Sequence, residues 1–491
     1  MVFDYVVLAS YIFSLVMLLI FASHGFIMLY YHRKYGEINH KQSDLPTDDM
    51  KVTIQLPLFN EYYVVERLID TVCEIEHPKE NMEIQVLDDS TDETVELAAE
   101  VVKRKQAEGF DIKHIHRTNR SGFKAGALKE GLKVAKGDYV AIFDADFLPK
   151  KDFLKTTLSY FTAEKIGMVQ TRWEHLNEDY SILTKIQALA LDGHHVIEQT
   201  VRNKAGFFIN FNGTGGVWRK ECIIDAGNWH ADTLTEDLDL SYRAQLKGWK
   251  FVYLRDVTTP AELPSEINAL KAQQFRWTKG AIETARKMLP TVLKSDLPLR
   301  VKLQSIFHLS NNIVFPFILL AGILNVPLIF IKNSGPYNNI FNFMAIFVTA
   351  FISSFLFYLY AQKDINEDWR KKIAMFPIFM AGSMGFAVNN TRAVVEGLLN
   401  RKSEFVRTPK FKVINKNDTF FKNKYLLTTK VDRSAIIELM LAVYCFIGVA
   451  ASIYFLEIAA LPFHLMFFFG FSSVSYLSLR QFFIKKKRLQ S

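Results

Sequence analysis

Acidic side chains follow two apolar segments of the chain, where strands of a sheet are expected to end. Asp88 and Asp89 come directly after one such segment, and Asp144 and Asp146 follow another as an Asp-x-Asp pair. At this spacing, two carboxylates can bind one hard divalent cation together with the diphosphate that the cation carries. The pair alone is common by chance, and Asp88 and Asp89 could instead cap the helix that follows them.

Two further groups lie later in the sequence. Asp237 ends the string Thr235-Glu236-Asp237 before a helical pattern, where it could face a cleft or act as a surface or capping acid. Arg276 and Trp277 end the string Gln-Gln-Phe-Arg-Trp. Arg276 can pair with a phosphate and Trp277 offers a flat face to a sugar ring, although a Trp anchored at a membrane surface beside an extended Arg gives the same pattern.

The elements that must position these groups belong to an α/β region between about residues 51 and 277. Short β-rich runs alternate there with helical stretches, which is typical of a largely parallel sheet. Ligands of such sheets bind beyond the carboxyl ends of the strands, so the turns after the strands are the expected binding region. An amphipathic stretch at 264–290 predicts one or two helices at a membrane surface. The expected strands cover residues 52–56, 84–87, 112–116, 139–143 and 168–170.

Five apolar runs are long enough to cross a bilayer. The first, at 5–31, is too long for the core of a signal peptide and has no basic residue before it, so we interpret it as a permanent anchor. Basic residues follow it directly, which places the region after it in the cytoplasm. The other four runs cover about residues 306–331, 340–360, 435–456 and 460–479.

A further apolar run, at 373–399, also contains amide and charged side chains and lies between two basic loops that should share the cytoplasmic side. We therefore expect an interfacial or re-entrant helix here rather than a single span. The expected organisation is an anchor (1–35), a catalytic region with its amphipathic helix (50–290), two spans (300–362), the interfacial helix with a cytoplasmic loop (373–434), two spans (435–480) and a basic cytoplasmic tail (481–491).

Composition excludes several classes of function. The chain has 491 residues, of which 49% are hydrophobic, and a formal charge of +8. The basic residues cluster beside apolar runs, which indicates membrane flanks rather than nucleic-acid binding. Cys73, Cys222 and Cys445 lie far apart, so neither a disulfide framework nor a zinc site is expected. The spans contain few ionisable residues, which disfavours a transporter or channel with a regulatory soluble domain.

Taken together, the acidic groups and the Gln-x-x-Arg-Trp string resemble the D, D, D, Q-x-x-R-W pattern of processive family 2 glycosyltransferases, such as cellulose, hyaluronan and mannan synthases. The strings at 57–61, 122–128 and 211–219 look most like those of the plant cellulose synthase-like A and C families and their bacterial relatives. The resemblance covers roughly residues 51–410.

The resemblance implies a GT-A fold, an inverting transfer from a nucleotide sugar, UDP-glucose or GDP-mannose, and a β-linked polysaccharide exported through the spans. Asp237 would be the general base, with Glu236 and Asp144 as further catalytic residues. Asp144 and Asp146 would hold Mg²⁺ or Mn²⁺, and Lys124 and Arg276 would stabilise the leaving diphosphate. Asp88 and Asp89 would hold the nucleoside and Trp277 the acceptor sugar. The predicted substrate-binding residues are Asn60, Glu61, Asp88, Asp89, Lys124, Gln273, Arg276 and Trp277.

The loop at 404–410 resembles the gating loop of these enzymes, although Arg407 and Pro409 depart from its pattern. A basic loop without that role is the alternative. The expected partners are the donor, a glycan acceptor, membrane lipids and export proteins. No cyclic-di-GMP-binding module is expected, and the charge pattern fits a bacterial inner membrane or a Golgi membrane, with a preference for the former. A transferase that adds one sugar to a lipid or oligosaccharide remains the alternative function.

Overall fold

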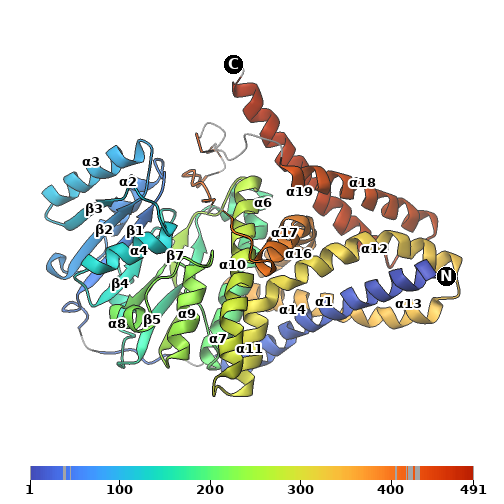
Figure 1. Cartoon of the computed structure of the whole chain (residues 1–491), viewed down its shortest axis with the longest axis horizontal. Helices are drawn as coiled ribbons and strands as arrows, with labels where there is room; N and C mark the ends of the chain where they lie inside the picture. The colour runs from blue at the N-terminus through green and yellow to red at the C-terminus, as the bar shows by residue number, and fades with distance from the viewer. Residues whose placement is uncertain are drawn as a thin grey trace.

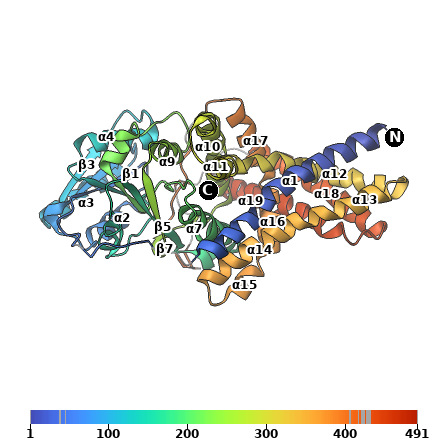
Figure 2. The same cartoon turned by 90° about the horizontal axis from the view of Figure 1, so that it is seen from below.

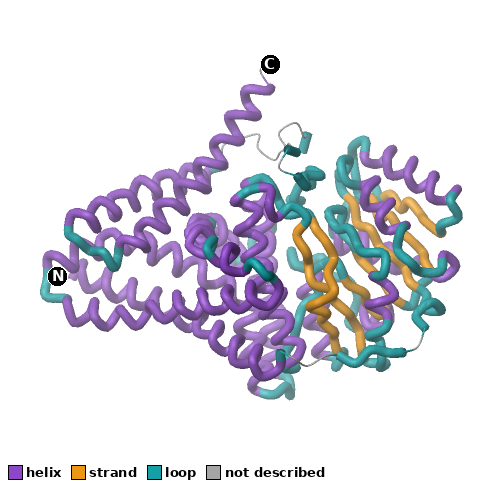
Figure 3. The backbone as a smooth tube through the Cα atoms, turned by 180° about the vertical axis from the view of Figure 1, so that it is seen from behind, coloured by secondary structure: helices purple, strands orange, loops and turns teal. Residues whose placement is uncertain are grey.

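The computed structural model describes residues 2–36, 40–44, 46–403, 406–415, 417–418, 424–425 and 432–489. An α/β domain occupies one end of the molecule and a group of long helices occupies the other (Figure 1). Figure 3 shows the strands confined to one end and the long helices extending away from them. The α/β domain, which carries the acidic strand ends singled out in the sequence, is therefore joined directly to the helical part.

The sheet of the α/β domain has seven strands in the order β3-β2-β1-β4-β6-β5-β7. Strand β6 pairs antiparallel with both of its neighbours, while the other pairings are parallel. The expected largely parallel sheet is therefore present, with one reversed strand. The strands are β1 (Val52–Leu58), β2 (Met82–Asp88), β3 (Asp111–His116), β4 (Tyr139–Ile142), β5 (Ile166–His175), β6 (Gly216–Arg219) and β7 (Lys250–Ala261).

Helices cover both faces of this sheet, so its central strands are buried on both sides. Successive residues of β4 show this: Ala141 belongs to one apolar cluster, whereas Val140 and Ile142 belong to the other. The first cluster includes α2 (Val65–Cys73), α3 (Thr94–Ala107) and α5 (Phe153–Leu158). The second includes α4 (Phe123–Val134), α8 (Lys220–Asp225) and α9 (Glu236–Leu246).

In the described part of the chain, five helical segments are long and apolar enough to cross a membrane, by length and composition. They are Val2–Tyr35, Leu299–Ser334, Asn338–Ile365, Arg433–Tyr454 and Leu461–Ile484, and they cover the five apolar runs of the sequence to within two residues at the ends of the runs. Seen from below, the first of them lies alongside helices from the second and third (Figure 2). Three of these segments are α1 (Val2–Tyr35), α18 (Arg433–Tyr454) and part of α19 (Leu461–Leu489). The second segment combines α11 (Leu299–Ser310) with α12 (Val314–Ser334), and the third combines α13 (Asn338–Met344) with α14 (Val348–Ile365).

The ambiguous run is broken into two helices. Helices α16 (Phe376–Gly385) and α17 (Ala387–Leu398) meet at a break, and α16, with the short α15 (Trp369–Ile373) before it, is bent by 48° from α17. A bend of this size fits a broken span or a re-entrant segment, so the expectation of an interfacial or re-entrant helix stays a prediction.

Helix α10 (Ile267–Lys294) lies between the sheet domain and the long helices (Figure 1). The amphipathic stretch predicted either one helix or two, and the structure shows a single helix of 28 residues. Two of its lysines, Lys271 and Lys279, are 3% and 0% exposed. Other parts of the chain therefore enclose the basic side of α10 as well as its apolar side.

The connection from β5 back to the sheet also reaches the helical part. It runs through α6 (Ile182–Asp192), a π-helix (Gly193–Gln199) and α7 (Thr200–Lys204). A π-helical turn widens the helix and is frequent near functional sites. His194, within it, contacts Asn212 at 3.3 Å and so connects this segment to the candidate site.

Candidate active site

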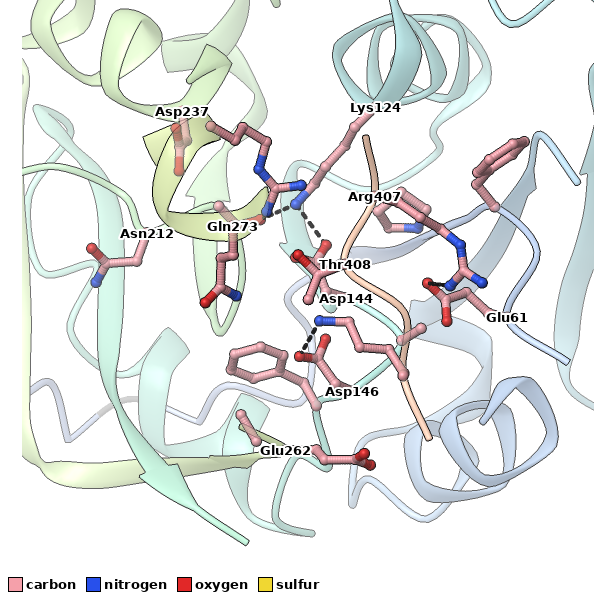
Figure 4. Close-up of a pocket in the computed structure, with 18 of the residues that line it drawn as sticks. Glu61, Lys124, Asp144, Asp146, Asn212, Asp237, Glu262, Gln273, Arg407 and Thr408 are labelled. Carbon is pink, nitrogen blue, oxygen red and sulfur yellow. Dashed lines mark hydrogen bonds and ion pairs between the residues drawn. The ribbon is translucent and has the colours of Figure 1, made fainter. Parts of the chain in front are cut away.

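A cavity of about 160 Å³ lies at the carboxyl ends of β1, β4 and β5, between the start of α9 and the first half of α10. Most of the residues singled out in the sequence line it, and Figure 4 shows several of them pointing toward one another. This volume is below the ~300–1,000 Å³ typical of small-molecule sites. The predicted site residues in its wall are Glu61, Asp89, Lys124, Asp144, Asp146, Glu236, Asp237, Gln273, Arg276 and Trp277.

The Asp-x-Asp pair lies just beyond the end of β4, and each carboxylate faces a lysine. Lys124 donates a hydrogen bond of 2.6 Å to Asp144 Oδ1, and Lys410 donates one of 2.5 Å to Asp146 Oδ2. The other oxygen, Asp146 Oδ1, is buried with no hydrogen-bond partner. A buried carboxylate oxygen without a partner is a free ligand for a hard cation, so the residues present fit a divalent metal.

Backbone conformation brings Asp237 close to this group. Gly213, between β5 and β6, has a φ of +80°, and a Cβ added there would lie 3.0 Å from Asp237 Oδ2 and 3.5 Å from Lys124 Nζ. Lys124 also donates to the Gly213 carbonyl oxygen at 2.8 Å. Only glycine combines the left-handed backbone with this close approach. The short Gly213 segment therefore determines how near Asp237 lies to Lys124.

Asp237 lies in the first turn of α9, and its Oδ1 accepts a hydrogen bond from its own neighbour, Leu238 N, at 2.8 Å. Burial, together with the negative charge of Glu236, raises the pKa of Asp237 to about 7, against the opposing effect of Lys124. A carboxyl group with this pKa exchanges a proton readily at neutral pH, which a general base requires.

Helix α10 supplies the opposite wall through Gln273, Arg276 and Trp277. Burial lowers the pKa of Arg276, opposed by the charges of Glu236 and the neighbouring aspartates, yet a guanidinium stays protonated near neutrality. The Trp277 and Trp173 rings lie 6.4 Å apart at 50°. These indoles form an aromatic surface beside the carboxylates, of the kind that binds the apolar face of a sugar ring.

The segment 406–410 closes the other side of the cavity, where Arg407, Thr408 and Lys410 contribute to the lining (Figure 4). Arg407 pairs with Glu61 at 2.9 Å. Burial raises the pKa of Glu61 to about 7, while the positive charges of Arg407 and Lys410 oppose the shift. The loop predicted to cover the donor site thus lies against the cavity; its first two residues, 404 and 405, are outside the described residues.

Asn60 and Asp88 do not line the cavity. Asn60 Oδ1 accepts a hydrogen bond from Thr91 N at 2.8 Å. Asp88 is fully buried and bonds Ser90 N and His114 Nε2 at 2.8 and 2.9 Å. Burial raises the pKa of Asp88, but these hydrogen bonds outweigh it and leave the pKa lowered. Both residues shape the turn after β2, and their direct contact with substrate stays a prediction.

Several lining residues were not predicted from the sequence. Glu262 directly follows β7, just as Asp144 and Asp146 follow β4, and this position at a strand end could have identified it. Arg120 stacks on Phe59 with its guanidinium carbon 3.3 Å from the ring centroid, a contact with no sequence signal. The other polar or aromatic lining residues outside the predicted set and the predicted loop are Phe147, Trp173, His175, Asn212 and Thr235.

Two other groups of side chains in the described residues have the composition of metal ligands. They are Asp88 with His114 and His116, and His230 with Asp232 and Asp239. In the second, Asp239 already pairs with Lys287 at 2.8 Å and with Arg243 at 2.8 Å. Neither group lies in the cavity, so the Asp-x-Asp pair is the group there that fits a metal.

Comparisons with known proteins agree with this arrangement. Residues 49–280 match the family described as "Glycosyltransferase like family 2". "Glucomannan 4-beta-mannosyltransferase 1" of Oryza sativa subsp. japonica is 42% identical over 276 residues, which are 54% of this chain and 53% of that protein. "Glucomannan 4-beta-mannosyltransferase 9" of Arabidopsis thaliana is 46% identical over 242 residues, 48% of this chain and 45% of that protein. The chain thus spans about half the length of the curated relatives it matches.

Among solved structures, a mannosyltransferase from Pyrobaculum calidifontis, in complex with GDP-Man and Mn²⁺, superposes with a TM-score of 0.54. It is 18% identical and the match covers 79% of this chain and all of the other. At this identity the likeness shows the fold alone, and the expected GT-A fold is confirmed. The relatives named above are plant proteins, so they give no support to the expected bacterial inner membrane.

Proposed function

Because residues 49–280 are a glycosyltransferase family 2 domain, we propose that the chain is an inverting mannosyltransferase that extends a β-1,4-linked polysaccharide from GDP-mannose. The single observation that carries the proposal is the meeting of Asp237 with Asp144, Asp146 and Lys124 in one cavity whose far wall is Trp277. In this proposal Asp237 is the base, the Asp-x-Asp pair with Lys124 binds the diphosphate, and Trp277 is the acceptor surface.

The choice of sugar rests on the relatives. Those named above are glucomannan 4-beta-mannosyltransferases, and the mannosyltransferase of similar fold was solved with GDP-Man. UDP-glucose is the alternative donor, since a few lining residues can change the specificity of such a pocket. In both cases a nucleoside diphosphate leaves and a hexose is transferred.

The proposed transfer is one displacement at the anomeric carbon. Asp237 takes the proton of an acceptor hydroxyl while the oxygen of that hydroxyl bonds to the anomeric carbon. The bond between this carbon and the phosphate oxygen breaks, and its electrons leave on the nucleoside diphosphate. Lys124 and Arg276 lie where they can neutralise this negative charge. A single displacement inverts the configuration, so an α-linked donor gives a β-linked product.

The metal fits the same scheme. A divalent cation held by Asp144 and Asp146 supplies further positive charge to the departing diphosphate when it is bound. Mn²⁺ and Mg²⁺ both suit carboxylate ligands, so the ion remains one of these two.

Processive synthesis is proposed from the position of Trp277 and from the long helices. Trp277 lies on α10, between the domain and the helices that are long enough to span a membrane. A polysaccharide cannot cross hydrocarbon unaided, so polymer export requires a protein path through such helices. The basic residues after α1 support a cytoplasmic position for the domain. Transfer of one sugar to a lipid or oligosaccharide is the alternative.

Radiolabelled transfer in isolated membranes tests the proposal. Membranes containing the wild type, Asp237→Asn or Asp179→Asn are incubated with labelled GDP-mannose or UDP-glucose and Mn²⁺ or Mg²⁺. Asp179, whose side chain is 84% exposed and lies outside the cavity, is the matched control. The expected result is a high-molecular-weight product from GDP-mannose that β-mannanase digests, absent in Asp237→Asn and retained in Asp179→Asn.

Other outcomes are equally informative. A β-glucanase-sensitive product from UDP-glucose would replace the proposed donor while retaining the mechanism. Label confined to lipid extracts or short oligosaccharides would reject processive synthesis. Equal activity in the wild type and in Asp237→Asn would reject Asp237 as the base.

A further inference from the structure

Lys279 is a fully buried lysine on α10, two residues beyond Trp277. Its ammonium group contacts Glu396 Oε2 at 3.4 Å and donates to the Arg401 carbonyl oxygen at 2.5 Å. It also donates to Ser403 Oγ. An ammonium group removed from water is costly unless it is paired and hydrogen-bonded, and here it has three acceptors. All three belong to the end of α17 or to the residues that follow it.

The packing of α10 against α17 is tight around this lysine. A Cβ added at Gly397 would lie 3.0 Å from Ile282 Cβ and 3.2 Å from the Lys279 carbonyl oxygen. Arg286, further along α10, donates to the Gly397 carbonyl oxygen at 3.0 Å. The absence of a side chain at position 397 allows the two helices to approach, which encloses Lys279 and leaves it facing the end of α17.

The chain held by Lys279 continues into the segment that lines the cavity. Arg407 follows Ser403 by four residues, so at most ~14 Å of extended chain joins their Cα atoms. Past Lys410 in the chain, Phe411 N and Val413 N donate hydrogen bonds of 3.1 and 3.2 Å to Glu262 Oε1, in the cavity wall. The cavity-lining segment is therefore fixed at both ends, by a cation on α10 and by a carboxylate at the end of β7.

From these contacts we propose that Lys279 is a positioning residue, which holds Arg401 and Ser403 against α10 and so keeps Arg407 and Lys410, a few residues further along the chain, at the cavity. It touches no substrate and acts through the backbone at Arg401 and the hydroxyl of Ser403. Holding Arg401 and Ser403 on α10 leaves Arg407 and Lys410 fewer positions away from the cavity, because the chain that leads to them is already held. The donor-side role in this proposal rests on the proposed function.

The helix offers its own control in Lys271. This lysine is also buried, and it pairs with Glu438 at 2.9 Å and donates to Ser434 at 2.6 Å, both on α18. Replacing either lysine by Met removes a buried ammonium group from α10. Only the change at Lys279 removes contacts to the segment that leads to Arg407.

Cross-linking tests the anchoring without any substrate. In the full chain, Glu61→Cys and Arg407→Cys place thiols at two positions whose native side chains meet at 2.9 Å, and a short bismaleimide joins them. Adding Lys279→Met is expected to lower the cross-linking yield about 5-fold, whereas Lys271→Met and Lys279→Arg leave it unchanged. An equal yield with Lys279→Met would overturn the proposal. The Glu61→Cys chain alone gives the background from native cysteines.

Kinetics provide the second readout, with otherwise native chains. Lys279→Met is expected to raise the KM for GDP-mannose about 10-fold with less change in kcat, since a charged hydrogen bond supports donor enclosure but not the chemical step. Lys279→Arg is expected to restore most of the loss. A Lys279→Met chain that lowers only kcat contradicts the proposal. If Lys279→Met does not fold, Ser403→Ala, which removes one acceptor, takes its place in both measurements.

The two kinds of failure are distinguishable. Wild-type chains that transfer no sugar would reject the proposed function, while the cross-linking yield would still report whether Lys279 anchors the segment. Active chains whose cross-linking ignores Lys279 would reject the anchoring alone.

Discussion

Lys410 Nζ lies 2.5 Å from Asp146 Oδ2, although 264 residues separate the two along the chain. Lys124 faces Asp144 in the same way, so both carboxylates of the Asp-x-Asp pair meet a lysine. Lys410 belongs to the segment that closes the cavity, whereas Lys124 belongs to the domain itself. The segment that covers the cavity therefore adds a positive charge to the group of atoms that fits a divalent cation.

Removing the ammonium group of Lys410 is expected to strengthen metal binding. Lys410→Met leaves Asp146 without its cationic neighbour, and a carboxylate relieved of a competing cation binds Mn²⁺ about 5-fold more tightly. Electron paramagnetic resonance of free Mn²⁺, titrated into the full chain without donor, measures this affinity. Lys412→Met, at an exposed lysine with the same charge change, is the control. Identical affinities in both variants would contradict the prediction.

Transfer is expected to depend on pH through Asp237. Its pKa is raised to about 7, and the base must be ionised, so the rate should fall about tenfold per pH unit below that value. Glu236→Gln removes a negative charge that raises this pKa, and should move the acid limb of the kcat/KM profile to lower pH.

Glu61 also has a pKa raised to about 7, and Glu61→Gln therefore identifies which carboxyl group the profile reports. The midpoint should stay near pH 7 in Glu61→Gln. A midpoint that moves in Glu61→Gln and not in Glu236→Gln would assign the titration to Glu61.

Gly213→Ala is expected to lower activity more than stability. The added Cβ would have to occupy a left-handed backbone and lie 3.0 Å from Asp237 Oδ2, displacing the carboxylate. A misplacement of this kind costs on the order of 100-fold in kcat. Gly206→Ala is the matched control, because its φ is +72° and nothing lies within 4 Å of the added carbon. The two variants should show similar falls in Tm, and equal activities would disprove the steric argument.

Trp277 is expected to govern product length. Trp277→Ala removes the aromatic face beside Trp173, a loss of about 1 kcal/mol of stacking for each acceptor sugar bound there. The acceptor then dissociates more often between transfers, so gel filtration should show shorter chains. Trp277→Phe keeps a ring and should give intermediate lengths; unchanged lengths in Trp277→Ala would exclude an acceptor role.

The ends of β2 and β4 and their acidic residues could be predicted from sequence, because each of these two strands is a short, largely apolar run that leads into the acidic side chains. Asp144 and Asp146 were found in this way. Strand β6 has only two apolar side chains, between Gly216 and Arg219, and β7 is interrupted by Arg255 and Asp256, so neither gave a clear apolar run. Glu262, at the end of β7, was missed with its strand.

The contacts of the segment 406–410 could not be predicted, for a different reason. Lys410 and Arg407 meet acids that lie hundreds of residues earlier, and their own local sequence has no periodic pattern. The burial of Lys279 was equally hidden, because an amphipathic helix with lysines has the same pattern at a membrane surface and inside a protein. Only the tertiary arrangement, with Glu396 and the end of α17 opposite, distinguishes the two cases.

Helix α10 is a single helix of 28 residues, about 42 Å long, and carries Arg276, Trp277 and Lys279 within one turn. In an α-helix each residue advances the direction of the side chain by about 100°. The two-residue interval between Trp277 and Lys279 therefore fixes the angle between their side chains around the helix axis. This angle directs the indole toward the cavity and the ammonium group toward α17. Inserting or deleting one residue within this interval would rotate one function away from its partner while leaving both side chains in the sequence. Substitutions in α10 therefore alter one function at a time, whereas a change in the spacing of its residues separates the two functions.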